Sequence, residues 1–175
     1  MRRLIPLDPA DAPEKSREML NDIISRRGAV GDMVATMAHS PALLQGYLDF
    51  SRAMKRVKIP RALSEKISLA VQEWIGCGTC MQAHIEAGRA AGLSETDIAL
   101  ARQGTSADTR EAALIAVAVR VLAEPSSITD EDVAELRAHG WSDRIVAEIV
   151  GVVALNLLTG AFNLMAGLQP VEESA

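Results

Sequence analysis

Residues 61–90 read RALSEKISLAVQEWIGCGTCMQAHIEAGRA and hold both cysteines of a chain of 175 residues. The apolar residues up to Trp74 predict a helix, and the glycines on either side of Cys77 mark a break, because glycine interrupts helical periodicity. A second helix follows and is expected to end near Gly92, since glycine suits the position just after a helix. The stretch therefore predicts two helices joined at the cysteine pair.

The rest of the chain continues the helical pattern. Residues 1–13 hold three prolines and predict an extended arm. Helices are expected from Pro13 to Ser25, after the cap at Ser40–Pro41, and after Ser94, where Asp97 completes a capping box. We expect one all-α domain over residues 1–175. It contains a weak internal repeat, with a redox-motif unit at 61–104 and a second unit with an interface helix at 110–168.

The amino-acid composition supports an all-α fold. Hydrophobic residues make up 49% of the chain and aromatic residues only 3%, which favours packed helices over a sheet. The net charge of −5 excludes the basic surface of a nucleic-acid-binding protein. No secretory signal is recognisable, so a cytoplasmic protein is expected.

The segment 149–168 is almost wholly apolar but contains Asn156 and Asn163. Two asparagines seven residues apart lie on one face of a helix, where they are costly in lipid and favourable at a buried protein contact. We expect a buried helix at a subunit interface rather than a membrane span. For Asn163 a place in a pocket is the alternative.

The cysteines and a histidine form the candidate site. On a helix, Cys77, Cys80 and His84 are spaced i, i+3 and i+7 and share one face. The N-terminus of a helix stabilises a thiolate, and this argument favours Cys77 as the more acidic thiol. His84 can move a proton, assisted by Glu65 on the preceding helix. Glu73 is a second carboxylate candidate.

Other interpretations of the same residues remain open. The two cysteines can be core residues, or they can bind zinc together with His84 and either Glu65 or water. A c-type haem is excluded because Met81, not histidine, follows the second cysteine. A thioredoxin-like reductase is disfavoured because the sequence shows no βαβ pattern.

Glu65 followed by the Cys77-x-x-Cys80-x-x-x-His84 pattern resembles the signature of the AhpD-like, carboxymuconolactone-decarboxylase-like family of alkylhydroperoxidases. Residues 31–41 and 128–163 resemble further segments of that family. The resemblance implies a bundle of helical hairpins that assembles into homotrimers or hexamers.

The resemblance also implies an enzymatic activity and the residues that carry it out. Hydroperoxides would be reduced by a dithiol/disulfide cycle in which Cys80 attacks, Cys77 resolves, and Glu65 and His84 relay protons. An external dithiol, protein or small molecule, would restore the pair, and no bound cofactor or metal is expected. Thr79 stands where the best-known members carry another histidine. The alternatives are a carboxymuconolactone-type decarboxylase or lyase, and a zinc- or redox-sensing protein without enzymatic activity.

Overall fold

A computed structural model describes residues 2–170 of the chain, and in this part every regular element is helical. The all-α prediction is therefore confirmed. The longer helices are α1 (Glu14–Arg27), α2 (Asp32–Met37), α3 (Pro41–Met54), α4 (Arg61–Ile75), α5 (Gly78–Ala90), α6 (Glu95–Arg102), α7 (Thr109–Ala123), α8 (Asp130–Ala138) and α9 (Asp143–Ala166). Two short 3-10 helices, η1 (Pro9–Asp11) and η2 (Pro125–Ser127), complete the list.

The predicted domain of residues 1–175 and its arm of residues 1–13 extend beyond this region. Residue 1 and residues 171–175 lie outside the described residues. The described arm runs along the ends of α9 and α2. Arg3 donates its backbone N–H to the carbonyl of Ala166 at 2.8 Å, and Leu7 donates to that of Ala35 at 3.1 Å.

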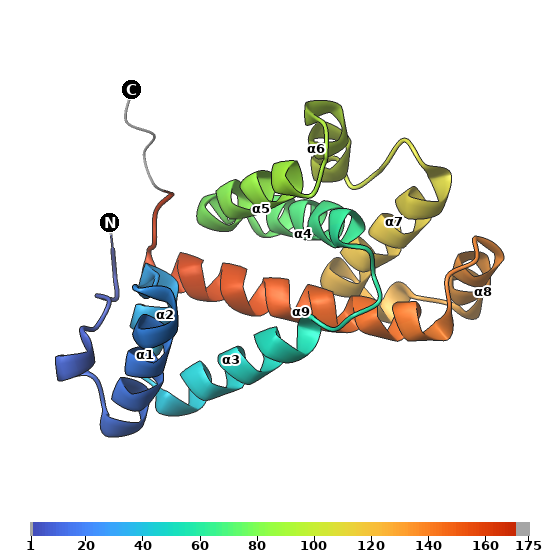
Figure 1. Cartoon of the computed structure of the whole chain (residues 1–175). Helices are drawn as coiled ribbons and strands as arrows, with labels where there is room; N and C mark the ends of the chain where they lie inside the picture. Colours follow the sequence, from blue (N-terminus) through green and yellow to red (C-terminus); the bar gives the residue numbers. More distant parts are fainter. Residues whose placement is uncertain (1, 171–175) are drawn as a thin grey trace.

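Helix α4 is the hub of the molecule, because it packs against α5, α6, α7 and α9. Figure 1 shows α9 crossing the molecule, with α4 and α5 on one side and α3 on the other. The main core lies between α4, α7 and α9 and includes the fully buried Ile67, Leu114 and Ile149. A second cluster around Leu20 and Leu44 joins α1 and α3.

The predicted helix ends are found close to their expected places. Ser40 caps α3 by accepting the backbone N–H of Leu43. Ser94 and Asp97 form the capping box of α6. Gly92 follows the end of α5 with a φ of 90°, a value that glycine adopts readily. Helix α2 is not predicted from the sequence; its six residues are too few to show a clear period.

A polar network joins α4 to α9 inside the protein. Asn156 on α9 donates to Ser68 Oγ at 3.0 Å, and the side-chain N–H of Gln72 donates to Asn156 Oδ1 at 2.9 Å. Asn156 therefore bonds at a buried protein contact, as expected, and its partners belong to the same chain. That α9 also lies at a subunit interface stays a prediction. Burying an amide is costly unless it is hydrogen-bonded, and Ser68 and Gln72 of α4 supply partners for the side chain of Asn156.

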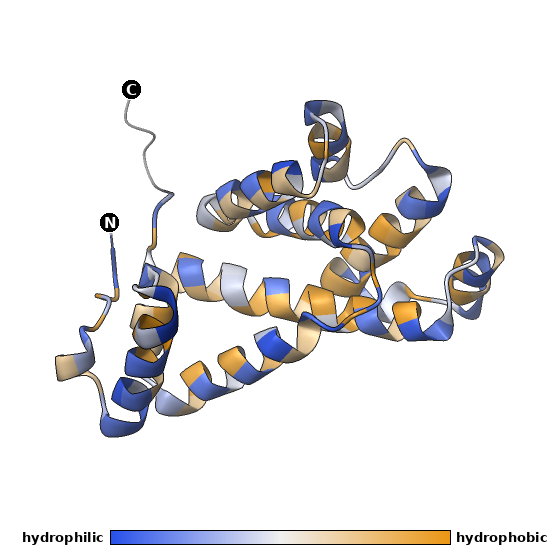
Figure 2. Cartoon of the chain, in the orientation of Figure 1, coloured by the Kyte–Doolittle hydropathy of each residue, from blue (hydrophilic) through white to orange (hydrophobic). Residues whose placement is uncertain are grey.

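Helix α9 is, by length and composition, the one helix among residues 2–170 that could cross a membrane. Figure 2 shows its predominantly apolar character. The core helices of soluble proteins have the same length and composition, and the buried face of α9 carries the asparagines that pair within this chain. The expectation that α9 is a core helix and not a span stays a prediction.

Candidate active site

The joint between α4 and α5 places the two cysteines together. Gly76 ends α4 with a φ of 78°, and Cys77 then caps α5 by accepting the backbone N–H of Cys80 at 3.3 Å. One helical turn brings the two Sγ atoms to 2.7 Å from each other. Both thiols are free and both side chains are buried. A small movement of the side chains is therefore enough to form a disulfide.

The pKa values of the two thiols move in opposite directions. The hydrogen bond from the Cys80 thiol, aided by the backbone N–H of Cys80, lowers the pKa of Cys77 to about 6 although the site is buried. The same bond, together with burial, raises the pKa of Cys80. The pair therefore loses its first proton more readily than an ordinary thiol and holds the second one between the two sulfurs.

A histidine and a carboxylate meet beside the pair. His84 lies one turn after Cys80 on α5, and its Nδ1 is 2.8 Å from Oε2 of Glu65 on α4. His84 is 27% exposed and Glu65 16%, so the imidazole is the more accessible of the two. A carboxylate at Nδ1 orients the ring and leaves Nε2 for another partner. The two groups together can hold and move a proton.

Glu73 is not part of this group. Its carboxylate forms an ion pair with Arg102 at 2.7 Å, on the surface of the protein. Glu65 is therefore the carboxylate that accompanies the cysteines. The difference arises because Glu73 lies eight residues beyond Glu65 on α4, where the helix has rotated a further 80° or so in addition to two full turns.

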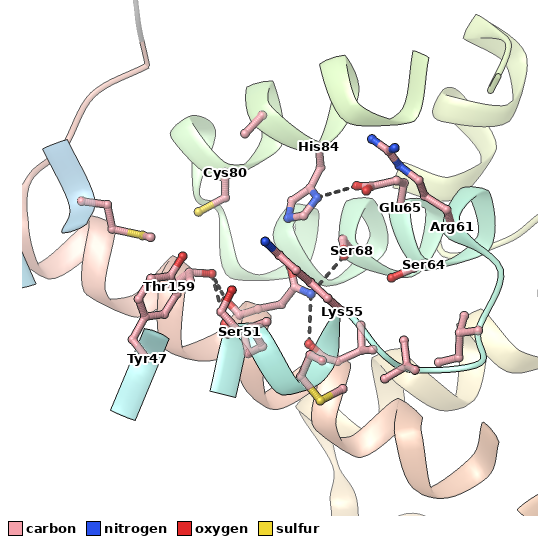
Figure 3. Close-up of a pocket in the computed structure, with 18 of the residues that line it drawn as sticks. Tyr47, Ser51, Lys55, Arg61, Ser64, Glu65, Ser68, Cys80, His84 and Thr159 are labelled. Atoms are coloured by element: carbon pink, nitrogen blue, oxygen red, sulfur yellow. Dashed lines mark hydrogen bonds and ion pairs between the residues drawn. The ribbon is translucent and has the colours of Figure 1, made fainter. Parts of the chain in front are cut away.

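A cleft of about 930 Å³ opens beside these residues. Cys80, Thr79, His84 and Glu65 line it from α5 and α4, as Figure 3 shows for the labelled side chains. Cys77 does not line the cleft. Cys80 is therefore the sulfur that a molecule in the cleft meets first, and Cys77 lies behind it.

The cleft is also lined by residues that lie far from the cysteine motif in the sequence. Helix α3 and the segment after it contribute Tyr47, Ser51 and Lys55, and α9 contributes Thr159 and Asn163. These residues lie between 22 and 86 positions from Cys77 in the sequence. Sequence alone offers no signal for Tyr47 or Ser51, because their distance from the cysteines is set by packing.

Asn163 has a direct role in the geometry of the site. Its side-chain N–H donates to the Sγ of Cys80 at 3.2 Å, and the residue is 4% exposed. The expected subunit contact is therefore wrong, and the pocket alternative is correct. The sequence does show an amide on one face of an apolar helix, which predicts a buried hydrogen bond. It does not show which residue the amide is bonded to.

The described part of the chain contains no group of three histidine, cysteine or acidic side chains arranged to hold a metal ion. Residues 2–170 thus offer no ligand set for the zinc alternative. His84 is bonded to Glu65, and Cys80 interacts with Cys77 and Asn163. The polar contacts of the site are those of a thiol pair with a proton carrier.

The fold is similar to several solved structures. One is an uncharacterized peroxidase-related protein with an alkylhydroperoxidase AhpD core from Ralstonia eutropha JMP134, with a TM-score of 0.80, 19% identity, and coverage of 98% of this chain and 95% of that one. A peroxidase-related protein from Silicibacter sp. TM1040 has a TM-score of 0.80, 18% identity, and coverage of 98% and 94%. The debrominase Bmp8 has a TM-score of 0.76, 20% identity, and coverage of 97% and 92%.

At these identities the likeness shows the fold alone, which is that of the AhpD core. Among curated protein sequences, none is significantly similar to this chain. Residues 41–124 match the model of the carboxymuconolactone decarboxylase family, and this segment includes Glu65, both cysteines and His84. The matched segment, 84 of 175 residues, makes just under half of this chain similar to the carboxymuconolactone decarboxylase family.

Proposed function

We propose that this protein is a thiol-dependent peroxidase that reduces hydroperoxides through a Cys77–Cys80 dithiol/disulfide cycle. The observation that carries the proposal is the pair of free sulfurs 2.7 Å apart, one of which lines a cleft together with the hydrogen-bonded His84 and Glu65. A thiolate with a nearby second thiol and a proton donor is what peroxide reduction requires. The AhpD-core fold of the peroxidase-related proteins is consistent with it.

The resting pair carries one negative charge, mainly on Cys77, and one proton on Cys80. Transfer of that proton to Cys77 places the thiolate on Cys80, which faces the cleft. The Cys80 thiolate then attacks one oxygen of the hydroperoxide, and the O–O bond breaks. Cys80 becomes a sulfenic acid, and the leaving oxygen takes a proton to form an alcohol.

His84 is the proton donor for the leaving oxygen, and Glu65 balances the charge of the protonated ring. The Cys77 thiol next attacks the sulfenic acid, so that a disulfide forms and water leaves. An external dithiol reduces this disulfide by exchange and becomes a disulfide itself. The sum is one hydroperoxide and one dithiol converted into one alcohol, one water and one oxidised dithiol.

The test is consumption of cumene hydroperoxide with dithiothreitol as the reductant. We expect Cys80→Ser to reduce the rate to background. Cys77→Ser should leave one turnover, with a sulfenic acid on Cys80 that dimedone traps. His84→Gln should lower kcat by about a hundredfold, because it removes the proton donor. Met81→Leu, next to the motif, is the matched control and should keep the wild-type rate.

Thiol counting provides a second measurement that is independent of the physiological substrate. The chain has two cysteines, so the expected count falls from two to zero after peroxide and returns after dithiothreitol. Equal peroxide consumption by the wild type and both cysteine variants would reject the proposal.

The family model names a second candidate, a decarboxylase acting on a small lactone acid. In that case His84 or Glu65 transfers a proton to or from carbon, and the cysteines are not needed. Decarboxylation that survives alkylation of both thiols would favour this activity over peroxide reduction.

A further inference from the structure

The cleft is much larger than hydrogen peroxide needs. Its volume of about 930 Å³ lies in the range of pockets that bind whole organic molecules. Much of its wall is apolar, formed by Met33, Met54, Val57, Ile59, Val152 and Leu155. Such a wall favours the burial of a hydrocarbon body. If the protein reduces hydroperoxides as proposed, its preferred substrate is therefore an organic one.

Two cations interrupt this apolar wall. Lys55 follows the last residue of α3, and Arg61 is the first residue of α4. Both side chains line the cleft and both are exposed. Within residues 2–170, neither side chain takes part in a hydrogen bond or an ion pair. Arg52 on α3, for comparison, forms an ion pair with Asp49 at 3.6 Å.

The carboxylate that lines the cleft already has a hydrogen-bond partner. Glu65 is the only carboxylate among the described residues that line the cleft, and it is bonded to His84. Lys55 and Arg61 thus add two positive charges that nothing in the cleft neutralises. This occurs in a chain with a net charge of −5, so the local charge is opposite to that of the whole molecule. Such a site attracts and orients an anion.

The two cations are also well placed relative to the sulfur. In Figure 3 the Lys55 side chain extends towards the part of the cleft that carries Cys80 and His84. Arg61 lies one helical turn before Glu65 on α4, so both share the helix face that borders the cleft. A ligand that spans the cleft can contact a cation at one end and Cys80 at the other.

We infer that the cleft selects hydroperoxides that carry a carboxylate on an apolar body, with Lys55 and Arg61 holding the carboxylate while the peroxide group faces Cys80. This rests on the proposed peroxidase function and adds the class of substrate. The cations contribute binding and orientation, and the chemistry at the sulfur is unchanged.

A matched pair of substrates tests the inference: cumene hydroperoxide with a para carboxylate, and the methyl ester of the same compound. Dithiothreitol, which is neutral, serves as the reductant, so any effect of charge belongs to the peroxide. The wild type is expected to prefer the acid by about tenfold in kcat/KM, since one charge-assisted hydrogen bond is worth about that factor. The preference should lie mainly in KM and weaken with added salt.

Lys55→Gln and Arg61→Gln should each reduce the acid-to-ester ratio, and the double variant should bring it close to 1. Arg56→Gln is the matched control. It removes the same charge from the same segment, but Arg56 does not line the cleft, so the ratio should stay at the wild-type value. Thermal unfolding of each variant checks that the fold is intact. A ratio near 1 in the wild type, with both compounds consumed, would overturn the inference and leave the peroxidase function standing.

A binding measurement separates the two proposals if no hydroperoxide is consumed. Isothermal titration of the reduced wild type with 4-isopropylbenzoate, and with its methyl ester, needs no turnover. Binding of the acid that is lost in the Lys55→Gln, Arg61→Gln double variant supports the anion site even if the redox function fails. Equal binding of acid and ester overturns it.

Discussion

Cys77 and Cys80 share their protons because Cys77 is both the N-cap of α5 and the neighbour of a second thiol. Two donors, the backbone N–H of Cys80 and the Cys80 thiol, point at one sulfur. Cys77 is the acidic thiol, as the helix-terminus argument predicts, whereas Cys80 faces the cleft. Cys77 thus has the lower pKa, whereas Cys80 is the thiol that a molecule in the cleft reaches. A proton can pass between the two sulfurs, which are 2.7 Å apart.

The pH profile of alkylation tests this arrangement. The pKa of Cys77 is lowered to about 6, so the reactive thiolate persists at pH 7 and disappears as the pH falls through that value. Asn163 donates to Cys80 and favours the charged form of both thiols. We expect Asn163→Ala to raise the apparent pKa of the pair by about 1, the effect of one hydrogen bond to a charged group.

The measurement is the rate of iodoacetamide reaction against pH, followed by mass spectrometry. Leu164→Ala, which changes the next and exposed residue of α9, is the control and should keep the wild-type profile. An unchanged profile in Asn163→Ala would show that the amide does not stabilise the thiolate. Such a result would leave Asn163 with a packing role.

Helices α4 and α9 approach each other closely behind the site, and Gly160 makes this possible. A Cβ atom at position 160 would lie 2.7 Å from Oε1 of Gln72 and 3.0 Å from Ile75. Gln72 is fully buried and its amide is bonded to Asn156, so it cannot move away freely. The spacing of the two helices therefore depends on the absence of a side chain.

Gly160→Ala is expected to lower the free energy of unfolding by about 1–3 kcal/mol, the usual cost of overpacking a core. Gly151→Ala on the same helix is the control. There the new Cβ would meet only the end of the Met54 side chain, at 2.7 Å, and a flexible side chain can turn aside. Alanine also favours the helix by up to about 1 kcal/mol over glycine, so Gly151→Ala should be neutral or stabilising. Urea unfolding measures both, and equal stability of the two variants would contradict the argument.

The outer face of α9 carries an apolar stripe. Val150, Leu157 and Leu164 are 53%, 46% and 42% exposed, and Met165 beside them is 70% exposed. Val150, Leu157 and Leu164 recur every seven residues, the spacing of a seam between packed helices. We propose that a second copy of this chain covers the stripe, in keeping with the homotrimer or hexamer that the family resemblance implies.

Leu157→Glu should disrupt this assembly, because it places a charge at the middle of the stripe. The expected result is a smaller mass in light scattering of the variant than of the wild type. Ala99→Glu adds the same charge on an exposed position of α6, away from the stripe, and should leave the mass unchanged. A wild-type protein that is monomeric at high concentration would refute the proposal.

The helices and the cysteine site were predictable where local chemistry sets them. Ser40, Ser94 and Gly92 mark helix ends because caps and left-handed glycines act over a few residues. The spacing of Cys80 and His84, one turn apart on α5, placed both at the cleft, whereas Cys77, the N-cap residue, lies behind Cys80. Asn163 was expected at a subunit interface and instead contacts Cys80 in the cleft, because the sequence shows that a buried amide needs a hydrogen-bond partner but does not identify that partner.

Sequence therefore established the class of fold, the joint between α4 and α5, and the motif that joins two thiols to a proton carrier. Packing alone established the cleft, the contact of Asn163 with Cys80, and the two unpaired cations at Lys55 and Arg61. The physical reason is the distance along the chain over which each kind of interaction acts. Hydrogen bonds and dihedral preferences act between neighbours in the chain, whereas a cavity is bounded by α3, α4, α5 and α9, whose relative positions depend on the burial of side chains far apart in sequence.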